Sequence, residues 1–228
     1  MDEVVKAVID AVNNAERRLV IAISGHGAAG KTTFSNQLLK AFGKENVSYL
    51  NTDAYIISSA LRKYTTIEYA YENTIHRSKL TACHPSAHHV LSLERDIKML
   101  REGMELYTID MPYAKSELLT PKPITIVEGM SAAFADPALF DLSIYFYTDD
   151  ETELVRRYGR DITERGADRN YLRRSHEERR IQYRLFMHSY SCNFDIVVKS
   201  TNEAVKIEKN TLTEMAVTKI QDEIGPVD

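Results

Sequence analysis

The sequence predicts an α/β fold with a parallel sheet of about five strands and helices on both faces. Short apolar segments, each bounded by charged residues, glycine or proline, recur along the chain at 19–24, 47–50, 124–127, 142–147 and 194–198. Runs of this length and composition are typical of strands buried on both faces of a sheet. Because they alternate with segments of helical periodicity, parallel pairing with helical crossovers is favoured.

Helices are predicted in the intervals between these strands. The first precedes the first strand and places valines and isoleucine at helical spacing, at Val4, Val5, Val8, Ile9 and Val12. The second ends at Gly43, a plausible C-terminal stop. The predicted helices cover residues 2–17, 33–42, 92–101, 151–164 and 170–189. Segment 55–90 is poorly periodic, and we expect it to be a functional excursion from the sheet more than a part of the core.

Composition favours one globular domain spanning residues 1–228. The chain is 43% hydrophobic and 27% charged, and its net charge of −4 argues against a nucleic-acid partner. Its two cysteines, Cys83 and Cys192, have no metal-type spacing. The acidic start at residues 1–3 and the short aliphatic stretch 19–23 argue against a signal peptide and a membrane partner. We therefore expect a cytoplasmic protein; a homo-oligomer is left open.

Residues 25–32 match the phosphate-loop pattern G-x-x-x-x-G-K-[ST] between a predicted strand and a predicted helix. Its small residues let backbone N–H groups turn toward phosphates, and the helix N-terminus adds positive charge. Lys31 would reach the β- and γ-phosphates, and Thr32 would bind Mg²⁺. The pattern predicts a P-loop NTPase-type sheet that binds a nucleoside triphosphate through Gly25, Gly27, Ala28, Ala29, Gly30, Lys31, Thr32 and Thr33. By itself it does not choose between kinase, GTPase and ATPase.

Two carboxylates follow predicted strands, at the edge where ligands bind in open parallel sheets. Asp53 follows the second strand and could accept a proton from a substrate hydroxyl and lie near Mg²⁺. Glu128 follows the third and could hold Mg²⁺ directly or through water. Alternatively, Asp53 is a helix N-cap or turn residue. Glu128 could likewise be a structural partner for Lys31 or the backbone.

An arginine-rich segment runs from Arg156 to Arg184, with ten arginines and five carboxylates and thus a net charge of +5. Gly166 would interrupt its helices, and we predict a lid over ATP at about 156–184. For Arg157 and Arg160 we favour a functional role, because arginine suits phosphate oxygens held in fixed geometry. For four further arginines we favour a solvated face with i,i+4 ion pairs: Arg173, Arg174, Arg179 and Arg180.

These pieces together resemble the uridine kinase and phosphoribulokinase family of P-loop kinases, over about residues 19–199. The matching segments are the phosphate loop, 51–53, 84–87, 101–103, 107–113, 126–129, 139–142 and 156–166. The resemblance implies ATP and Mg²⁺ as cofactors and a small-molecule hydroxyl as acceptor. It implies that Asp53 is the base, with Lys31 and Arg160 also acting in catalysis. It further implies Mg²⁺ ligation by Thr32, Asp53 and Glu128, and phosphate contacts by Arg157, Arg160 and Arg165.

The acceptor half departs from the family pattern. Uridine kinases carry an aspartate before the His-Pro pair, where this chain has Cys83, and a Phe-Tyr pair two residues after the base aspartate, where it has Tyr55-Ile56. Ala167 stands where a second lid arginine is usual. We therefore predict ATP-dependent phosphorylation of a small-molecule hydroxyl, with uridine disfavoured as the acceptor.

Two other functions stay open. The altered acceptor half would fit a nucleotide-binding regulatory protein without acceptor phosphorylation, and the arginine segment alone would suggest nucleic-acid binding. We expect His84, His88 and His89 to line the acceptor pocket or cap a helix more than to bind a metal. Segment 200–202, after the fifth strand, is the predicted place of adenine.

Overall fold

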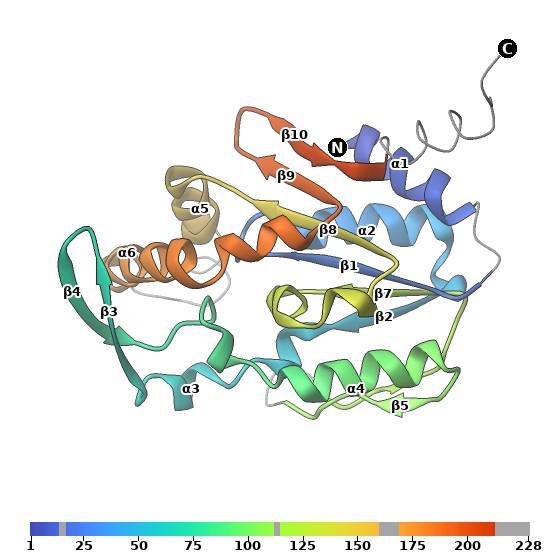
Figure 1. The fold of residues 1–228 in the computed structure, drawn as a ribbon, viewed down its shortest axis with the longest axis horizontal. Coiled ribbons are helices and arrows are strands. Elements are labelled where there is room, and N and C mark those ends of the chain that lie inside the picture. Colours follow the sequence, from blue (N-terminus) through green and yellow to red (C-terminus); the bar gives the residue numbers. More distant parts are fainter. Residues whose placement is uncertain (14–16, 112–114, 160–168, 213–228) are drawn as a thin grey trace, which may run out of the picture.

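The computed structural model describes residues 1–13, 17–111, 115–159 and 169–212, and a six-stranded sheet forms its centre (Figure 1). The strand order is β10-β9-β8-β1-β7-β2. Their bounds are β1 Leu19–Gly25, β2 Val47–Asn51, β7 Ile124–Glu128, β8 Leu142–Tyr147, β9 Ile196–Ser200 and β10 Val205–Asn210. All neighbouring pairs are parallel except β9 and β10, which form an antiparallel edge. The predicted α/β class and its five strands are confirmed, whereas β10 was not predicted.

Helices cover both faces of the sheet. The α-helices are α1 Asp2–Asn13, α2 Lys31–Phe42, α3 Ser59–Arg62, α4 Val90–Arg101, α5 Asp150–Arg157 and α6 Arg169–Phe186. Short 3₁₀ turns are η1 Lys44–Asn46, η2 Thr52–Tyr55, η3 Pro85–Ala87, η4 Met130–Phe134, η5 Pro137–Leu139 and η7 His188–Asn193. The predicted helices match α1, α2, α4, α5 and α6, although residues 14–16 and 160–168 lie outside the described part. No helix in that part is long and apolar enough to cross a membrane.

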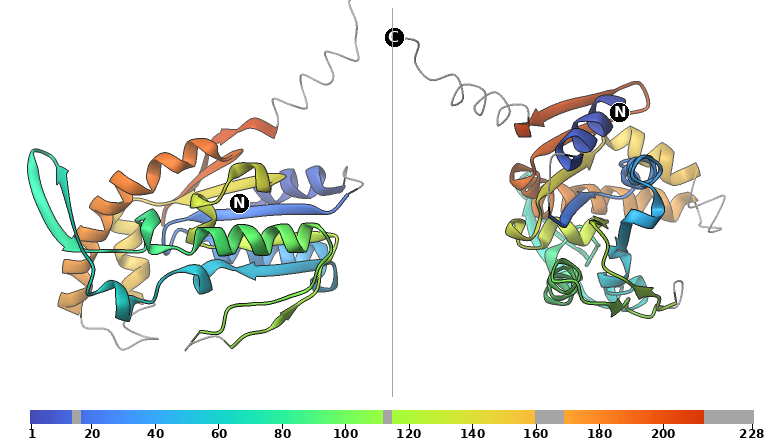
Figure 2. Two further views of the ribbon diagram at one scale, coloured as in Figure 1. Left: turned by 60° about the horizontal axis from the view of Figure 1, so that its bottom comes forward. Right: turned by 90° about the vertical axis from the view of Figure 1, so that its right-hand side faces the viewer.

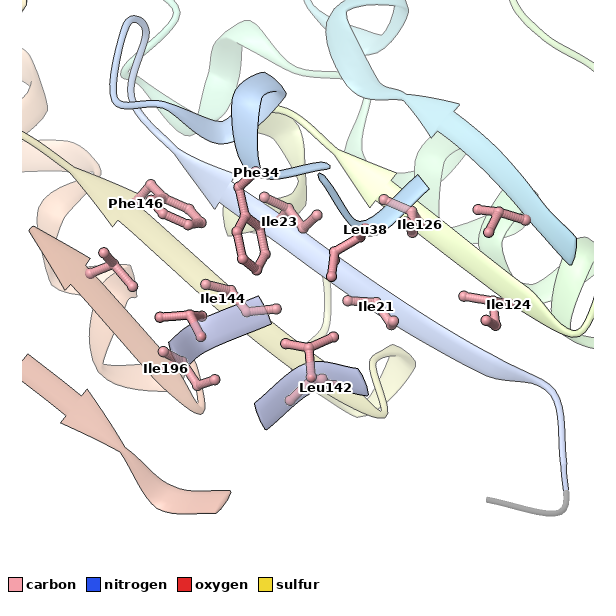
Figure 3. Packing of buried hydrophobic residues seen from close by; sticks show 14 of the residues in the cluster. Ile21, Ile23, Phe34, Leu38, Ile124, Ile126, Leu142, Ile144, Phe146 and Ile196 are labelled. Carbon is pink, nitrogen blue, oxygen red and sulfur yellow. The ribbon is translucent and has the colours of Figure 1, made fainter. Parts of the chain in front are cut away.

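Alternating side chains of β1 divide the core into two layers. Ile21 and Ile23 pack with Phe34 and Leu38 of α2, and the same cluster includes two valines of α1 (Figure 3). Val20 and Ala22 point to the opposite face of the sheet. There Val20 packs in a cluster with residues of α4 and η4, and Ala22 packs in a cluster with residues of η4 and α6. Because successive side chains of a strand alternate between faces, a strand that is apolar at every position requires cover on both sides.

The excursion at 55–90 contains an antiparallel hairpin, β3 Thr66–Tyr71 and β4 Thr74–Lys79, which projects from one end of the sheet (Figures 1 and 2). A second, shorter hairpin pairs β5 Leu106–Tyr107 with β6 Leu118–Leu119. Gln182 of α6 attaches the base of the first hairpin, because its side chain bonds the Ser78 hydroxyl, the Lys79 carbonyl and the Thr81 N–H. Neither hairpin was predicted, since exposed polar residues mask the two-residue period.

We predict that Gly25→Ala destabilises the fold strongly. Gly25 has a φ of +129°, and a Cβ there would lie 1.8 Å from the carbonyl oxygen of Phe146 in β8. Backbone strain and overpacking should together lower the free energy of unfolding by about 2–5 kcal/mol. Urea unfolding followed by circular dichroism would measure the loss.

The matched control is Gly159→Ala, because a Cβ at Gly159 would meet no atom within 4 Å. Removing a glycine there should leave stability unchanged or raise it by up to about 1 kcal/mol. Equal stability of the two variants would contradict the close packing of β1 against β8 at this point.

Candidate active site

The phosphate loop, residues 25–32, connects the end of β1 to the first turn of α2. Its backbone has positive φ angles at Gly25 (129°), Ala28 (65°) and Gly30 (100°). Left-handed residues turn nearby N–H groups toward one concave side, which is the geometry of an anion-binding nest. Gly30 directly precedes α2, so this concave side lies at the positive end of a helix. The loop thus has the backbone geometry that phosphate binding requires.

Three side chains at the start of α2 face the same region. Lys31 is 8% exposed, and its Nζ donates a hydrogen bond to the carbonyl oxygen of His26 at 3.0 Å, so the ammonium group lies over the loop. Thr32 and Thr33 are exposed. A pocket of about 580 Å³ opens there, lined by Met1, Ala28, Gly30, Lys31, Thr32, Thr33, Arg156 and Ser200. Five predicted nucleotide-binding residues therefore share one pocket with Ser200, the first residue of the segment predicted to hold adenine.

The two predicted carboxylates lie at the carboxyl ends of neighbouring strands. Glu128 ends β7, opposite Ile23 of β1 on one side and Asn51 of β2 on the other. It is 4% exposed, whereas Asp53, in η2, is exposed. The side chain of Asn51 accepts a hydrogen bond from the N–H of Asp53 at 2.8 Å and is the N-cap of η2. Asp53 is therefore not an N-cap, but it does lie within a 3₁₀ turn, as the other half of that alternative states.

Tyr49 of β2 is hydrogen-bonded to Glu128 and lies within the electrostatic influence of Asp53. Its hydroxyl donates a hydrogen bond of 2.8 Å to Oε2 of Glu128. Burial raises the pKa of Tyr49 above its usual value, and the negative charges of Glu128 and Asp53 raise it further. The sequence analysis missed this residue. Its two-residue spacing from Asn51 places it on the same face of β2, which is the available sequence signal.

The arginines of α5 divide into two environments. Arg156 donates hydrogen bonds to the carbonyl oxygens of Ala28, Ser200 and Thr201, at 3.2, 3.2 and 2.9 Å, and so links the phosphate loop to the end of β9. Arg157, the next residue of the helix, has a side chain that is 12% exposed, with its Nη1 3.9 Å from Oε1 of Glu153. Arg160 and Arg165 lie outside the described residues, so the predicted lid is described only in part.

Glu153, which the sequence analysis did not select, lies at the centre of a buried charge cluster. Its side chain is 1% exposed, its Oε2 is 2.9 Å from Nη1 of Arg180, and its Oε1 is 3.3 Å from Nε of Arg179. Burial alone would raise the pKa of this carboxyl, but the positive charges of Arg179 and Arg180 hold it well below its usual value. Glu153 is therefore a carboxylate at neutral pH.

His26, inside the phosphate loop, is the neutral member of this cluster. Burial lowers its pKa to about 3, against the opposing influence of Glu153. Its Nε2 accepts a hydrogen bond from the N–H of Thr148 at 3.0 Å, which assigns the proton to Nδ1. Nδ1 lies 2.9 Å from the carbonyl oxygen of Gly27 and 3.4 Å from Glu153. His26 thereby connects the loop to β8 and α5.

The favoured interpretation of four lid arginines as a solvated face is wrong for Arg180, which is 7% exposed. Its guanidinium group bridges two carboxylates, with Nη2 2.5 Å from Asp150 and Nη1 2.9 Å from Glu153. Arg179 is also largely covered, with an 18% exposed side chain, whereas Arg173 is exposed. Nothing is described of the Arg174 side chain. The sequence spacing alone could not reveal this burial, because Glu153 lies in a different helix, α5, far beyond the reach of an i,i+4 pair.

In the segment where the sequence predicts the acceptor pocket, the histidine side chains have hydrogen-bond partners within the protein. His84 caps η3 by accepting a hydrogen bond from the N–H of Ser86, which confirms one of its two predicted roles. His88 contacts the Ser131 hydroxyl through Nδ1, 2.8 Å, and the Ala82 carbonyl through Nε2, 2.9 Å. Cys83 is fully buried, which raises the pKa of its thiol, and Ile56 forms a bridge with His88.

Sequence comparison connects this geometry to known proteins. Residues 20–206 match the model of the phosphoribulokinase / uridine kinase family. The chain is 25% identical, over 223 residues, to the uridine kinase of Ligilactobacillus salivarius, covering 92% of this chain and 96% of that protein. It is 30% identical, over 162 residues, to the uridine kinase of Lactococcus lactis subsp. cremoris, covering 66% of this chain and 72% of that one.

The fold agrees with this relationship. The structure of phosphoribulokinase from Rhodobacter spheroides superposes with a TM-score of 0.58 at 14% identity, covering 81% of this chain and 71% of that chain. The family match extends from β1 into β10 and includes the phosphate loop, both strand-end carboxylates and the arginine-rich segment. The chain therefore belongs to the phosphoribulokinase / uridine kinase family, a family of ATP-dependent small-molecule kinases.

Proposed function

We propose that this kinase transfers the γ-phosphate of ATP to a hydroxyl group of a small molecule at the carboxyl edge of β1, β2 and β7. The observation that carries the proposal is the common edge of the phosphate loop, Glu128 and Asp53. Phosphoryl transfer requires a phosphate cradle, charge neutralisation and a positioned hydroxyl more than covalent chemistry. That edge offers residues suited to each requirement.

Within this proposal the phosphate loop and Lys31 hold the β- and γ-phosphates. Asp53 accepts the proton of the acceptor hydroxyl, which its exposed position on η2 allows. Arg157 contacts phosphate oxygens, and Arg160 and Arg165 are assigned the same role from the sequence resemblance. Arg156 is assigned a different role, because its bonds to Ala28 and Ser200 fix one wall of the nucleotide pocket.

The donor atoms at this edge fit Mg²⁺. Thr32 offers a hydroxyl oxygen, and Asp53 and Glu128 offer carboxylate oxygens; Mg²⁺ in kinases is bound by one or two such side chains together with substrate phosphates and water. When bound, Mg²⁺ neutralises charge on the phosphates. The hydrogen bond from Tyr49 to Oε2 of Glu128 orients that carboxylate toward the loop edge.

For the acceptor, we propose a small hydroxyl compound and place nucleosides first among those to be tested, because the similar proteins are named uridine kinases. Cys83 bears on the choice. A buried thiol cannot replace a carboxylate that accepts hydrogen bonds from ribose hydroxyls, since thiols are weak acceptors and burial keeps this one protonated. Recognition of ribose hydroxyls at this position, and with it uridine bound as in uridine kinases, is therefore disfavoured, so sugar phosphates and vitamin alcohols belong in the same panel.

We predict that Asp53→Asn abolishes acceptor-stimulated ATP consumption without loss of ATP binding. The amide keeps the size of the side chain but cannot accept the hydroxyl proton, so turnover should fall about 10²- to 10⁴-fold. The measurement is coupled ATP consumption with Mg²⁺ across nucleosides, sugar phosphates and vitamin alcohols.

A compound that stimulates the wild-type protein and not the variant identifies the acceptor. An Asp53→Asn protein that turns over at the wild-type rate would rule out Asp53 as the base. A wild-type protein that binds ATP but responds to no compound would favour the nucleotide-binding regulatory protein instead.

We further predict that Tyr49→Phe raises the Mg²⁺ concentration needed for half-maximal activity by about tenfold, because the hydrogen bond from Tyr49 orients the Glu128 carboxylate that would bind the metal. Mn²⁺ binding in the presence of ADP, measured by electron paramagnetic resonance, should weaken by a similar factor and gives a readout independent of turnover. Tyr107→Phe is the matched control, since Tyr107 is 69% exposed on β5. An unchanged metal dependence in Tyr49→Phe would contradict the proposed ligation by Glu128.

A further inference from the structure

Arg179 of α6 reaches across the mouth of the phosphate loop. A Cβ at Gly27 would lie 2.8 Å from its Nη2, so the guanidinium group rests directly against the loop backbone. The same Nη2 lies 3.5 Å from Sδ of Met130, two residues after Glu128. Arg179 therefore spans the gap between the ends of β1 and β7, where the proposed function places the phosphate that is transferred.

Glu153 fixes the direction of this side chain. It contacts Arg179 through Nε, at 3.3 Å, while Nη2 of the same guanidinium group lies beside Gly27 and Met130. A guanidinium group is planar, so a contact at Nε determines where its other nitrogens point. The thioether of Met130 is a weak acceptor, and a phosphate oxygen in its place would form a much stronger, charge-assisted bond.

The neighbouring Arg180 has a different environment. Its two Nη atoms are already engaged by carboxylates, Nη2 by Asp150 and Nη1 by Glu153. Its charge is balanced within the cluster, and its position is set by the buried pair. Arg180 therefore links α6 to α5 and to His26, 3.4 Å from its Nη1, whereas Nη2 of Arg179 lies against the loop backbone at Gly27.

We propose that Arg179 is a further catalytic residue that contacts the γ-phosphate of ATP, and that Glu153 is the positioning residue that directs it there. The proposal rests on the proposed function, because it assumes that ATP occupies the phosphate loop. It adds to the lid a phosphate contact from α6. An arginine beside the transferred group stabilises the charge that develops on it during transfer.

The test compares binding of two nucleotides and needs no acceptor. Isothermal titration calorimetry with Mg²⁺ would measure ADP and the non-hydrolysable analogue AMP-PNP against wild type and Arg179→Ala. Loss of a charge-assisted bond should weaken AMP-PNP about 10- to 100-fold and change ADP less than about twofold. Arg173→Ala, an exposed arginine on the same helix, is the matched control and should alter neither.

Glu153→Gln should weaken AMP-PNP selectively as well, and adding it to Arg179→Ala should cause no further loss, because it acts through that arginine. A merely structural role of Glu153 would instead add its effect in the double variant and weaken ADP too. Should Glu153→Gln fail to fold, Arg179→Ala and its control still decide the assignment of Arg179.

The inference is overturned if Arg179→Ala weakens ADP and AMP-PNP equally, or neither. In that case wild-type binding of both nucleotides leaves the proposed function standing. Absence of binding to the wild-type protein would overturn the proposed function and this inference together.

Discussion

The parallel pairing of β1 with β7 and β8 is the constraint on which the candidate site depends. It places Glu128 opposite Ile23, two residues before the phosphate loop begins, and it places Gly25 opposite Phe146 so closely that no side chain fits. Parallel strands end at a common edge, so groups far apart in sequence meet there. The β2 strand, paired with β7, then brings Asp53 to the same edge. A register shift of one residue in β7 would turn Glu128 to the other face.

A second network, polar and buried, connects this edge to the helices that follow β8. The N–H of Thr148, just after β8, bonds His26 in the loop, and Glu153 in α5 lies within 3.4 Å of the same ring. Neutral His26 costs less to bury than a charged imidazolium would, whereas Glu153 stays ionised because arginines surround it. The loop therefore does not rest on α2 alone. Movement of α5 or α6 would change its surroundings directly.

Much of the donor half could be predicted from the sequence, because local patterns determine it. The phosphate loop is a contiguous motif, and Asp53 and Glu128 follow apolar strands that are recognisable alone. The edge strand β10 and the hairpins escaped prediction, since exposed strands lack the apolar runs that identify buried ones. Arg180 was assigned to a solvated face because its partners, Asp150 and Glu153, lie about 30 residues away, beyond any i,i+4 rule. Whether such a residue is buried or solvated depends on tertiary contacts that the local sequence does not show.

The Glu153 cluster is better explained by positioning than by stability. Burying charges costs several kcal/mol for each ion before their attraction is counted, and well-packed apolar residues often stabilise a core at least as well. An apolar replacement would fill the space between α5, α6 and β8, but it would not orient a guanidinium group. A buried carboxylate that contacts Arg179 through Nε and Arg180 through Nη1 does so, and its location beside His26 places the effect at the phosphate loop. The free-energy cost of burying Glu153 thus falls beside the phosphate loop, where the direction of the Arg179 guanidinium group determines whether it reaches a phosphate.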